Sequence, residues 1–138
     1  MKKKKLVFGG GRRKFLRNTD SDHKDPLKKG DRIDNRNLID EWTDKMRRQN
    51  LQHKFLWNKT DFLNLRPYEY DHILGLFNWD HMDYDIDREE NKEEPSIKEM
   101  VKKAIEILST NPKGFYLLVE AGRIDHGKLY FNSEIFLV

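Results

Sequence analysis

Short apolar runs recur along the chain, separated by longer polar stretches. A short run rich in apolar and β-branched or aromatic residues predicts a β-strand. Such runs are found at residues 6–8, 55–57, 72–77 and 115–119. The last of them, Phe-Tyr-Leu-Leu-Val, is unbroken, which is typical of a strand buried on both faces of a sheet.

Two stretches have apolar residues at helical spacing. The first carries them on one face, with Trp42 expected in the core: Leu38, Ile39, Trp42 and Met46. The second begins at a capping box formed by Ser96 and Glu99 and has a longer apolar face: Ile97, Met100, Val101, Ala104, Ile105 and Leu108. Pro112 and Gly114 end it just before the run at 115–119.

Helices alternating with strands predict an α/β fold, here a partial, mostly parallel sheet flanked by helices. A brief further helix is expected over residues 61–65, capped by Thr60. Residues 18–34 are polar and contain Pro26 and Gly30, which predicts a loop.

Composition limits these expectations. The 138 residues allow at most one domain, and hydrophobic residues (36%) barely balance charged ones (37%). This balance suits a surface-rich piece better than a complete domain with a buried sheet. Cysteine is absent, which excludes disulfides and thiolate chemistry. No signal peptide and no apolar run of membrane-spanning length is expected, since only three apolar residues follow the first lysines.

The formal net charge of +3 is unevenly distributed. Residues 1–60 hold 18 Lys and Arg against 8 Asp and Glu, whereas the rest of the chain is acidic. A basic arm over residues 2–17 could therefore bind nucleic acid or another anion. The simpler alternative is a solvated terminus. The glycines at 9–11 are not followed by Gly-Lys-Ser/Thr, so they do not form a P-loop.

The richest chemistry follows the run at 115–119. Within seven residues come four ionisable side chains, with glycines between them: Glu120, Arg123, Asp125 and His126. Open α/β sheets place their ligands at the carboxyl ends of parallel strands, and carboxylate with imidazole suits Zn²⁺ or Mg²⁺. A polar turn without function is the plain alternative.

The nine residues Val119–Gly127 resemble the alkaline phosphatase motif Val-Glu-Gly-Gly-Arg-Ile-Asp-His-Gly-His-His, with Ala121 in place of the first glycine. The resemblance implies that Glu120 binds Mg²⁺ and Asp125 binds a catalytic Zn²⁺. The two histidines that end the family motif are replaced by Lys128 and Leu129. The chain is therefore divided into an alkaline phosphatase-like fragment at 1–127 and a non-family tail at 128–138.

Other stretches resemble the same family. Residues 9–12 are similar to its Leu-Gly-Gly-Gly-Arg stretch. Residues 37–42, at the start of the first expected helix, are similar to its Asn-Leu-x-x-Glu-Trp helix. Asn58 begins an Asn-X-Thr sequon in a matching context, which implies a glycosylation site. The stretch Gly75-Leu76-Phe77 resembles the lead into the family's calcium site, which implies Ca²⁺ ligands at the Phe77 carbonyl, Asn78 and Glu94.

The acidic segment at 80–94 has a second interpretation. Four of its carboxylates occupy positions one, three, five and twelve of an EF-hand loop: Asp83, Asp85, Asp87 and Glu94. Arg88 stands where that loop needs a glycine, so the EF-hand is not favoured.

The resemblance implies a hydrolase of phosphate monoesters that uses a serine nucleophile with zinc and magnesium. It also implies an extracellular or cell-surface protein, often membrane-anchored and homodimeric, without a nucleic-acid partner. The nucleophile's Asp-Ser-Ala sequence is not in this chain, so the chain alone is expected to be inactive. The alternatives are a non-catalytic calcium- or zinc-binding module, built on Glu120, Asp125 and the acidic segment, and the basic anion or nucleic-acid binder described above.

Overall fold

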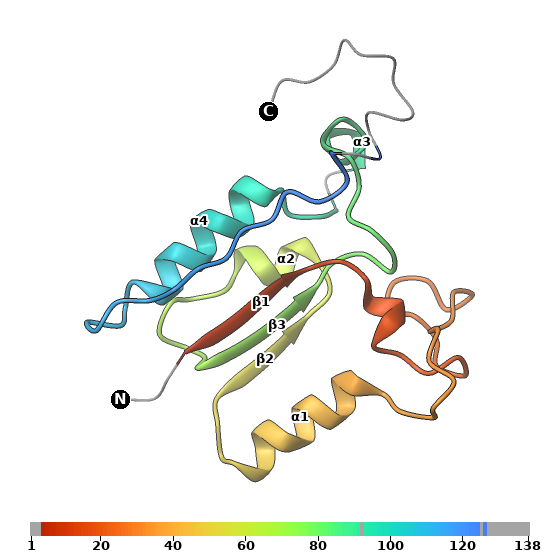
Figure 1. Cartoon of the computed structure of the whole chain (residues 1–138), viewed down its shortest axis with the longest axis horizontal. Coiled ribbons are helices and arrows are strands. Elements are labelled where there is room, and N and C mark those ends of the chain that lie inside the picture. The colour runs from red at the N-terminus through yellow and green to blue at the C-terminus, as the bar shows by residue number, and fades with distance from the viewer. Residues whose placement is uncertain (1–3, 92, 125, 127–138) are drawn as a thin grey trace.

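The computed structural model describes residues 4–91, 93–124 and 126. Three parallel strands form a sheet with the order β1-β3-β2. The elements, in chain order, are β1 (Lys5–Gly9), a 3₁₀ turn η1 (Arg12–Lys14), α1 (Leu38–Arg48), β2 (His53–Leu56), α2 (Lys59–Leu63), β3 (His72–Leu76), α3 (Asp85–Asn91) and α4 (Ile97–Leu108). The α/β class and the parallel sheet agree with the expectation from sequence (Figure 1).

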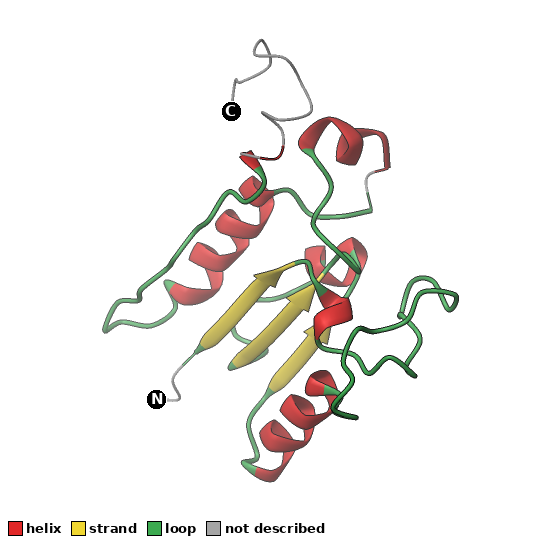
Figure 2. Ribbon diagram, turned by 45° about the vertical axis from the view of Figure 1, so that its right-hand side comes forward, coloured by secondary structure: helices red, strands yellow, loops and turns green. Residues whose placement is uncertain are grey.

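The sheet has an apolar layer on each face. On one face, Ile73 and Phe77 join Leu56, Phe62 of α2 and Ile107 of α4 in a buried cluster. On the other face, a second cluster contains Leu74 and Leu76 of β3 and Ile39 of α1. Leu16 joins them from the first loop, which we define as residues 15–37. Trp42 packs against this second cluster, as expected. Figure 2 shows the strands lying between α1 and the pair α2 and α4.

Gly75 allows the first cluster to close. A Cβ built at this position would lie 2.6 Å from the Phe77 ring and 2.8 Å from the Phe8 ring. Neither ring can retreat easily, because Phe8, Phe62 and Phe77 pack edge-on or tilted with centroids 5.3–6.0 Å apart. Only glycine fits in the middle strand at this point.

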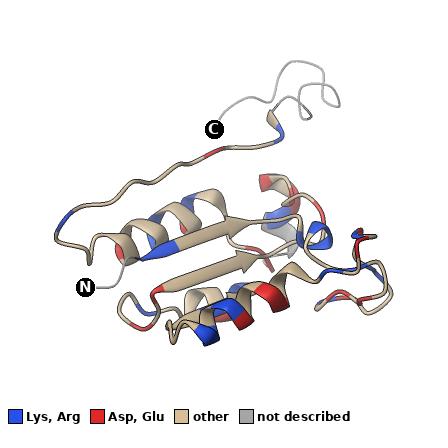
Figure 3. Cartoon of the chain, turned by 60° about the horizontal axis from the view of Figure 1, so that its bottom comes forward, with Lys and Arg blue, Asp and Glu red and all other residues tan. Residues whose placement is uncertain are grey.

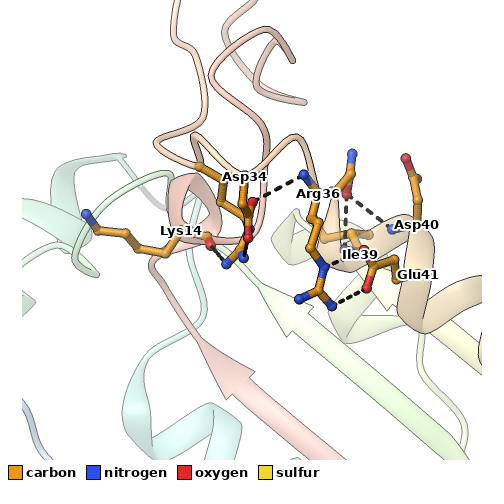
Figure 4. Close-up of polar contacts among 8 residues, drawn as sticks. Lys14, Asp34, Arg36, Ile39, Asp40 and Glu41 are labelled. Carbon is orange, nitrogen blue, oxygen red and sulfur yellow. Dashed lines mark hydrogen bonds and ion pairs between the residues drawn. The ribbon is translucent and has the colours of Figure 1, made fainter.

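The helix starts follow from their capping residues. Asn37 caps α1, since its Oδ1 accepts from the backbone N–H groups of Ile39 and Asp40 at 3.1 and 3.2 Å. Arg36, just before it, donates to the Glu41 carboxylate of the first turn through two nitrogens (Figure 4). At α4 the predicted capping box is present in both directions.

Two expectations are wrong, and one helix was not expected. Residues 115–119 form no strand: no described strand lies beside them to accept and donate ladder hydrogen bonds. The short second helix spans Lys59–Leu63 and is capped by Asn58, not Thr60, because the Asn58 Oδ1 reaches the Asp61 N–H at 2.8 Å. Helix α3 was not expected, since its seven residues are mostly charged. None of the described helices has the length and apolar composition needed to cross a membrane.

A buried ion pair joins η1 to the first loop. Arg12 is fully buried, and its Nε and Nη2 donate to the Asp22 carboxylate at 2.6 and 2.8 Å. Its Nη1 donates to the Leu76 carbonyl at the end of β3. Burial alone would raise the pKa of Asp22, but hydrogen bonds from Arg12 and from the Lys24 and Asp25 N–H groups hold that pKa below its ordinary value.

Replacing Asp22 with Asn should lower the free energy of unfolding at pH 7 by about 3–5 kcal/mol, since the Arg12 guanidinium would remain buried without a counter-charge. Urea denaturation followed by circular dichroism measures this loss. The double variant Arg12→Met/Asp22→Leu removes both charges and should be less destabilised. The wild type should lose the same stability in acid, as pH falls through the lowered pKa of Asp22.

Asp44→Asn, at an exposed position of α1, is the matched control and should change the free energy of unfolding by no more than about 0.5 kcal/mol. An Asp22→Asn variant as stable as this control would contradict the role given to the ion pair.

Candidate functional site

The carboxyl ends of β1 and β3 open into a pocket of about 590 Å³. It is enclosed by four segments: the turn at Gly10 and Gly11, the loop from Asp80 to Asp85, the start of α4 at Ser96, and the motif residues from Glu120 to Arg123. We call it the strand-end pocket. Its position agrees with the general rule that ligands of open α/β sheets lie at this edge.

The turn that follows β1 is not a phosphate cradle. The backbone N–H groups of Gly11, Arg12 and Arg13 donate to the carbonyls of Asp80, Asn78 and Trp79, respectively. These donors are therefore already used by the loop after β3. A Cβ at Gly10 would lie 2.6 Å from the Asp80 carbonyl oxygen, so glycine is required for the two segments to approach.

Glu120 lines the strand-end pocket and is exposed. Within the described residues it makes no hydrogen bond or ion pair, which leaves its carboxylate open to a ligand. Asp125, the expected Zn²⁺ ligand, lies outside the described residues. The ring of His126 stands perpendicular to that of His81, with centroids 5.6 Å apart.

Arg123 fastens the motif to the loop after β3. Its Nη1 donates to the Met82 carbonyl at 2.9 Å, and its guanidinium lies 3.9 Å from the centroid of the Tyr84 ring. The backbone of Arg123 is left-handed, with φ of 69°, a conformation that residues other than glycine rarely adopt. These contacts give Arg123 a structural role.

A zinc or magnesium centre needs more ligands than this part of the chain provides. A catalytic Zn²⁺ normally has three protein ligands. In the described ranges, no group of three or more His, Asp or Glu residues could hold a metal ion. The described residues alone therefore do not fit Zn²⁺ or Mg²⁺, and Glu120 is one isolated carboxylate of the expected set.

The residues expected to bind calcium, in contrast, lie together. Asn78 follows β3 and donates through Nδ2 to Glu94, and the Glu94 Oε2 accepts from the Asp83 N–H at 3.1 Å. The Asp83 carboxylate lies 3.4 Å from the same Asn78 nitrogen. Phe77, whose carbonyl was the third expected ligand, is buried beside them at the end of β3.

Glu94 is a buried acid: only 4% of its surface is exposed. Its burial raises the pKa of the carboxyl above the ordinary value, and the nearby Asp83 charge adds to the increase. Hydrogen bonds from the Asp83 N–H and from Asn78 oppose this shift without cancelling it. Two carboxylates and an amide, all hard ligands, are the chemistry that Ca²⁺ prefers.

Sequence reasoning missed part of this cluster. Asp83 was recognised only as an EF-hand position, and α3 occupies residues 85–91 of that supposed loop, which excludes the EF-hand geometry. Asp22, in the first loop, was not recognised either. No local pattern indicated it, because the burial of its partner Arg12 is seen only in the structure.

Asn58 follows β2, is partly exposed, and caps α2 with its side chain. Its Oδ1 accepts from the Asp61 N–H, and its Nδ2 donates to the Asp61 carboxylate at 3.0 Å. A glycan is attached through Nδ2 and keeps the amide carbonyl, so the helix cap and a glycan are compatible.

Comparison with known proteins identifies the family. The sequence model of the alkaline phosphatase family matches residues 1–133, and so reaches into the expected tail. The chain is 44% identical to "Membrane-bound alkaline phosphatase" of Bombyx mori and 46% identical to "Alkaline phosphatase" of Gadus morhua. It is 43% identical to "Alkaline phosphatase, tissue-nonspecific isozyme" of Homo sapiens.

Each of these matches covers 88% of this chain but only 22%, 26% and 24% of the relative, respectively. The chain thus spans about a quarter of the length of the curated relatives. The family match over nearly all of its residues confirms the resemblance seen in the sequence motif: this chain belongs to the alkaline phosphatase family.

Proposed function

We propose that this chain is part of a metal-dependent phosphomonoesterase, to which it contributes the carboxylates of Glu120 and Asp125. The observation that supports this most strongly is the family match over residues 1–133, which includes the motif Val119–Gly127. The substrate class is a phosphate monoester. Zinc and magnesium, when bound, would activate the nucleophile and stabilise negative charge on oxygen.

The chain alone is proposed to be inactive. Its described residues offer no complete metal site, and no serine in the sequence has the Asp-Ser-Ala context of the family nucleophile. The described residues instead provide the scaffold on which Glu120 lines the strand-end pocket.

A chimera tests both parts of this proposal. Residues 1–127 should replace the matching region of the Bombyx mori relative with retention of activity toward a chromogenic phosphate ester. In the chimera, Glu120→Ala or Asp125→Ala should lower kcat/KM at least about 100-fold, because even outer residues of metal sites have effects of 10–100-fold. Glu106→Ala, on the exposed side of α4, should leave activity unchanged.

The 138-residue chain by itself should show no turnover in saturating Zn²⁺ and Mg²⁺ at alkaline pH. Turnover by the isolated chain that disappears in Asp125→Ala would contradict the inactivity proposal. An active chimera insensitive to both substitutions would contradict the role of the two carboxylates.

A second proposed function is calcium binding by Asn78, Asp83 and Glu94, with the Phe77 carbonyl as a further ligand. The buried Glu94 carboxylate supports it, because a cation would relieve the unfavourable burial of its charge. In the structure the Asn78 amide nitrogen faces Glu94. Calcium would require that amide to present its oxygen instead. Because Asn78 is neutral, weak binding is expected.

Calcium should therefore raise the midpoint of thermal unfolding, by an amount that corresponds to about 2.7 kcal/mol at a hundred times the dissociation constant. Glu94→Gln should abolish this shift. The same variant should not be less stable without calcium at pH 7, since the raised pKa of Glu94 means that stability falls as pH rises through it.

Glu93→Gln is the matched control: this neighbouring acid is exposed and paired with Lys24, so the calcium shift should remain. A calcium shift that survives Glu94→Gln, or no shift at millimolar calcium, would contradict the site.

We also propose a secreted or cell-surface location, with a glycan at Asn58. One relative is named as membrane-bound, and the sequon is partly exposed, with Thr60 in contact with solvent. In the same way, we propose that the whole protein binds zinc and magnesium, forms a homodimer and is anchored to a membrane.

Expression through a secretory pathway should add glycan mass at Asn58, detected by peptide mass spectrometry. Asn58→Asp and Thr60→Ala should both remove the glycan, and both should keep the cap of α2, since aspartate caps helices well and Thr60 does not cap this one. Asn58→Ala should additionally lower the free energy of unfolding by about 1 kcal/mol. Secreted protein with only unmodified Asn58 would contradict the proposal.

The basic segment gives less support to an anion or nucleic-acid binder. Arg12 is buried against Asp22, Arg13 contacts Asp31 and Asp80, and Arg17 pairs with Asp20. Lys14 also contacts Asp31. These carboxylates offset much of the positive charge that the sequence places between residues 12 and 17.

A further inference from the structure

The motif that contains Glu120 is attached to the described fold by one side chain. Residues 114–119, which lead into the motif from α4, carry no charge (Figure 3). Figure 1 shows this segment running back along α4 in an extended form. Of the described residues from 115 to 124, only Arg123 makes a hydrogen bond to another part of the described chain. The place of Glu120, three residues earlier, therefore depends on how firmly Arg123 is bound.

Packing does not fix this part of the motif. Gly122 is exposed, and a Cβ built at its position would meet nothing within 4 Å. Arg123, the next residue, has the left-handed φ of 69°, which is unfavourable for a residue with a Cβ. Such a conformation persists only where the surrounding contacts hold it. The contacts of the Arg123 side chain therefore set the course of the backbone here.

Tyr84 supplies one of these contacts through its ring. The Arg123 guanidinium lies 3.9 Å from the ring centroid, well within the range of a cation–π attraction. The other contact, the hydrogen bond to the Met82 carbonyl at 2.9 Å, comes from the same loop. Asp83, between these two residues, donates its N–H to the buried Glu94 at 3.1 Å. The loop that holds Arg123 is thus itself held from its other side.

The hydroxyl of Tyr84 takes no part in this contact. Its oxygen is buried and, within the described part of the chain, has no hydrogen-bond partner. The ring alone therefore holds the guanidinium of Arg123, and a phenylalanine ring should hold it equally well. This difference allows the role of the ring to be separated from that of the hydroxyl by experiment.

We propose that Tyr84 is a positioning residue: its ring holds Arg123, and through Arg123 it keeps the Glu120 carboxylate in the strand-end pocket. All three residues line that pocket. The catalytic consequence rests on the phosphomonoesterase function proposed above. The contact between Tyr84 and Arg123, in contrast, lies entirely within this chain, so it can be tested without any activity.

Trypsin cleavage after Arg123 measures how often this arginine leaves the Tyr84 ring. The protease must take the arginine side chain into its own specificity pocket, so it cuts only the released form. In the 138-residue chain, Tyr84→Leu should speed this cleavage about five- to thirtyfold, because the cation–π contact is lost. Tyr84→Phe should be cleaved as slowly as the wild type. Mass spectrometry measures each rate relative to cleavage after the exposed Lys113 of the same segment.

Two controls accompany these variants. Tyr68→Leu makes the same change at a tyrosine that is 82% exposed and whose ring centroid lies 5.7 Å from the Lys4 Nζ. It should leave cleavage after Arg123 unchanged. Cleavage after Arg12, which has no exposed surface, reports unfolding of the whole chain. An increase at Arg123 that exceeds the increase at Arg12 is therefore local release.

A double-mutant cycle in the chimera tests whether Tyr84 acts through Glu120. Tyr84→Leu should lower kcat/KM about tenfold or more, as is typical of residues that orient metal ligands, and Tyr84→Phe should not. Combined with Glu120→Ala, the same Tyr84→Leu change should have almost no further effect, because the group that it positions is gone. A residue that only stabilised the fold would lower kcat/KM equally with and without Glu120.

Three results would overturn the proposal. The first is equal cleavage after Arg123 in the wild type and in Tyr84→Leu. The second is cleavage of Tyr84→Phe as fast as that of Tyr84→Leu, which would assign the contact to the hydroxyl. The third is additive effects of the Tyr84 and Glu120 substitutions on kcat/KM. A wild-type chimera without activity would contradict the phosphomonoesterase function instead, and the trypsin rates would still decide whether Tyr84 holds Arg123.

Discussion

The guanidinium of Arg12 holds together the parts of the molecule on which the candidate sites depend. It reaches Asp22 in the first loop and the Leu76 carbonyl at the end of β3 from the turn that leaves β1. A charged group with no exposed surface is stable only when its hydrogen bonds are satisfied. This requirement fixes where the first loop and the end of β3 lie relative to each other, and hence the shape of the strand-end pocket.

Around that ion pair, the loop after β3 is bound on both sides. Its carbonyls accept from the turn after β1, and the Arg13 guanidinium stacks 4.9 Å from the Trp79 ring centroid. On its far side the same loop accepts from Arg123 through Met82 and donates to Glu94 through Asp83. The two candidate metal regions thus share one loop, although their carboxylates are separated by many residues in the sequence.

Local patterns were sufficient for much of the fold. The apolar run before Phe77, the face of α1 and the capping box at Ser96 predicted their elements because each is determined by neighbouring residues. The motif at Val119–Gly127 likewise indicated the family. In contrast, the run at 115–119 was assigned a strand that this chain does not form, because a strand needs a partner and composition says nothing about one.

The sites show the same division. Glu94 and Asn78 were expected together through resemblance, whereas the pairing of Arg12 with Asp22 depends on a fully buried side chain that no local pattern encodes. Helix α3 was missed for a different reason: its charged residues have no apolar periodicity. For Arg12 and Asp22, the sequence did not indicate that the two side chains are buried together.

The strand order has a consequence for how the chain assembles. β2 and β3 are close in sequence and are joined through α2, whereas β1 pairs Lys5 with His72 across a long intervening stretch. Loop-closure entropy makes the nearer pair easier to form, and parallel pairing at long range slow. During synthesis β1 leaves the ribosome first, yet it has no sheet partner until β3 has emerged. The glycine-rich turn and the Arg12 contact with Leu76 therefore take shape only after the middle of the chain has folded.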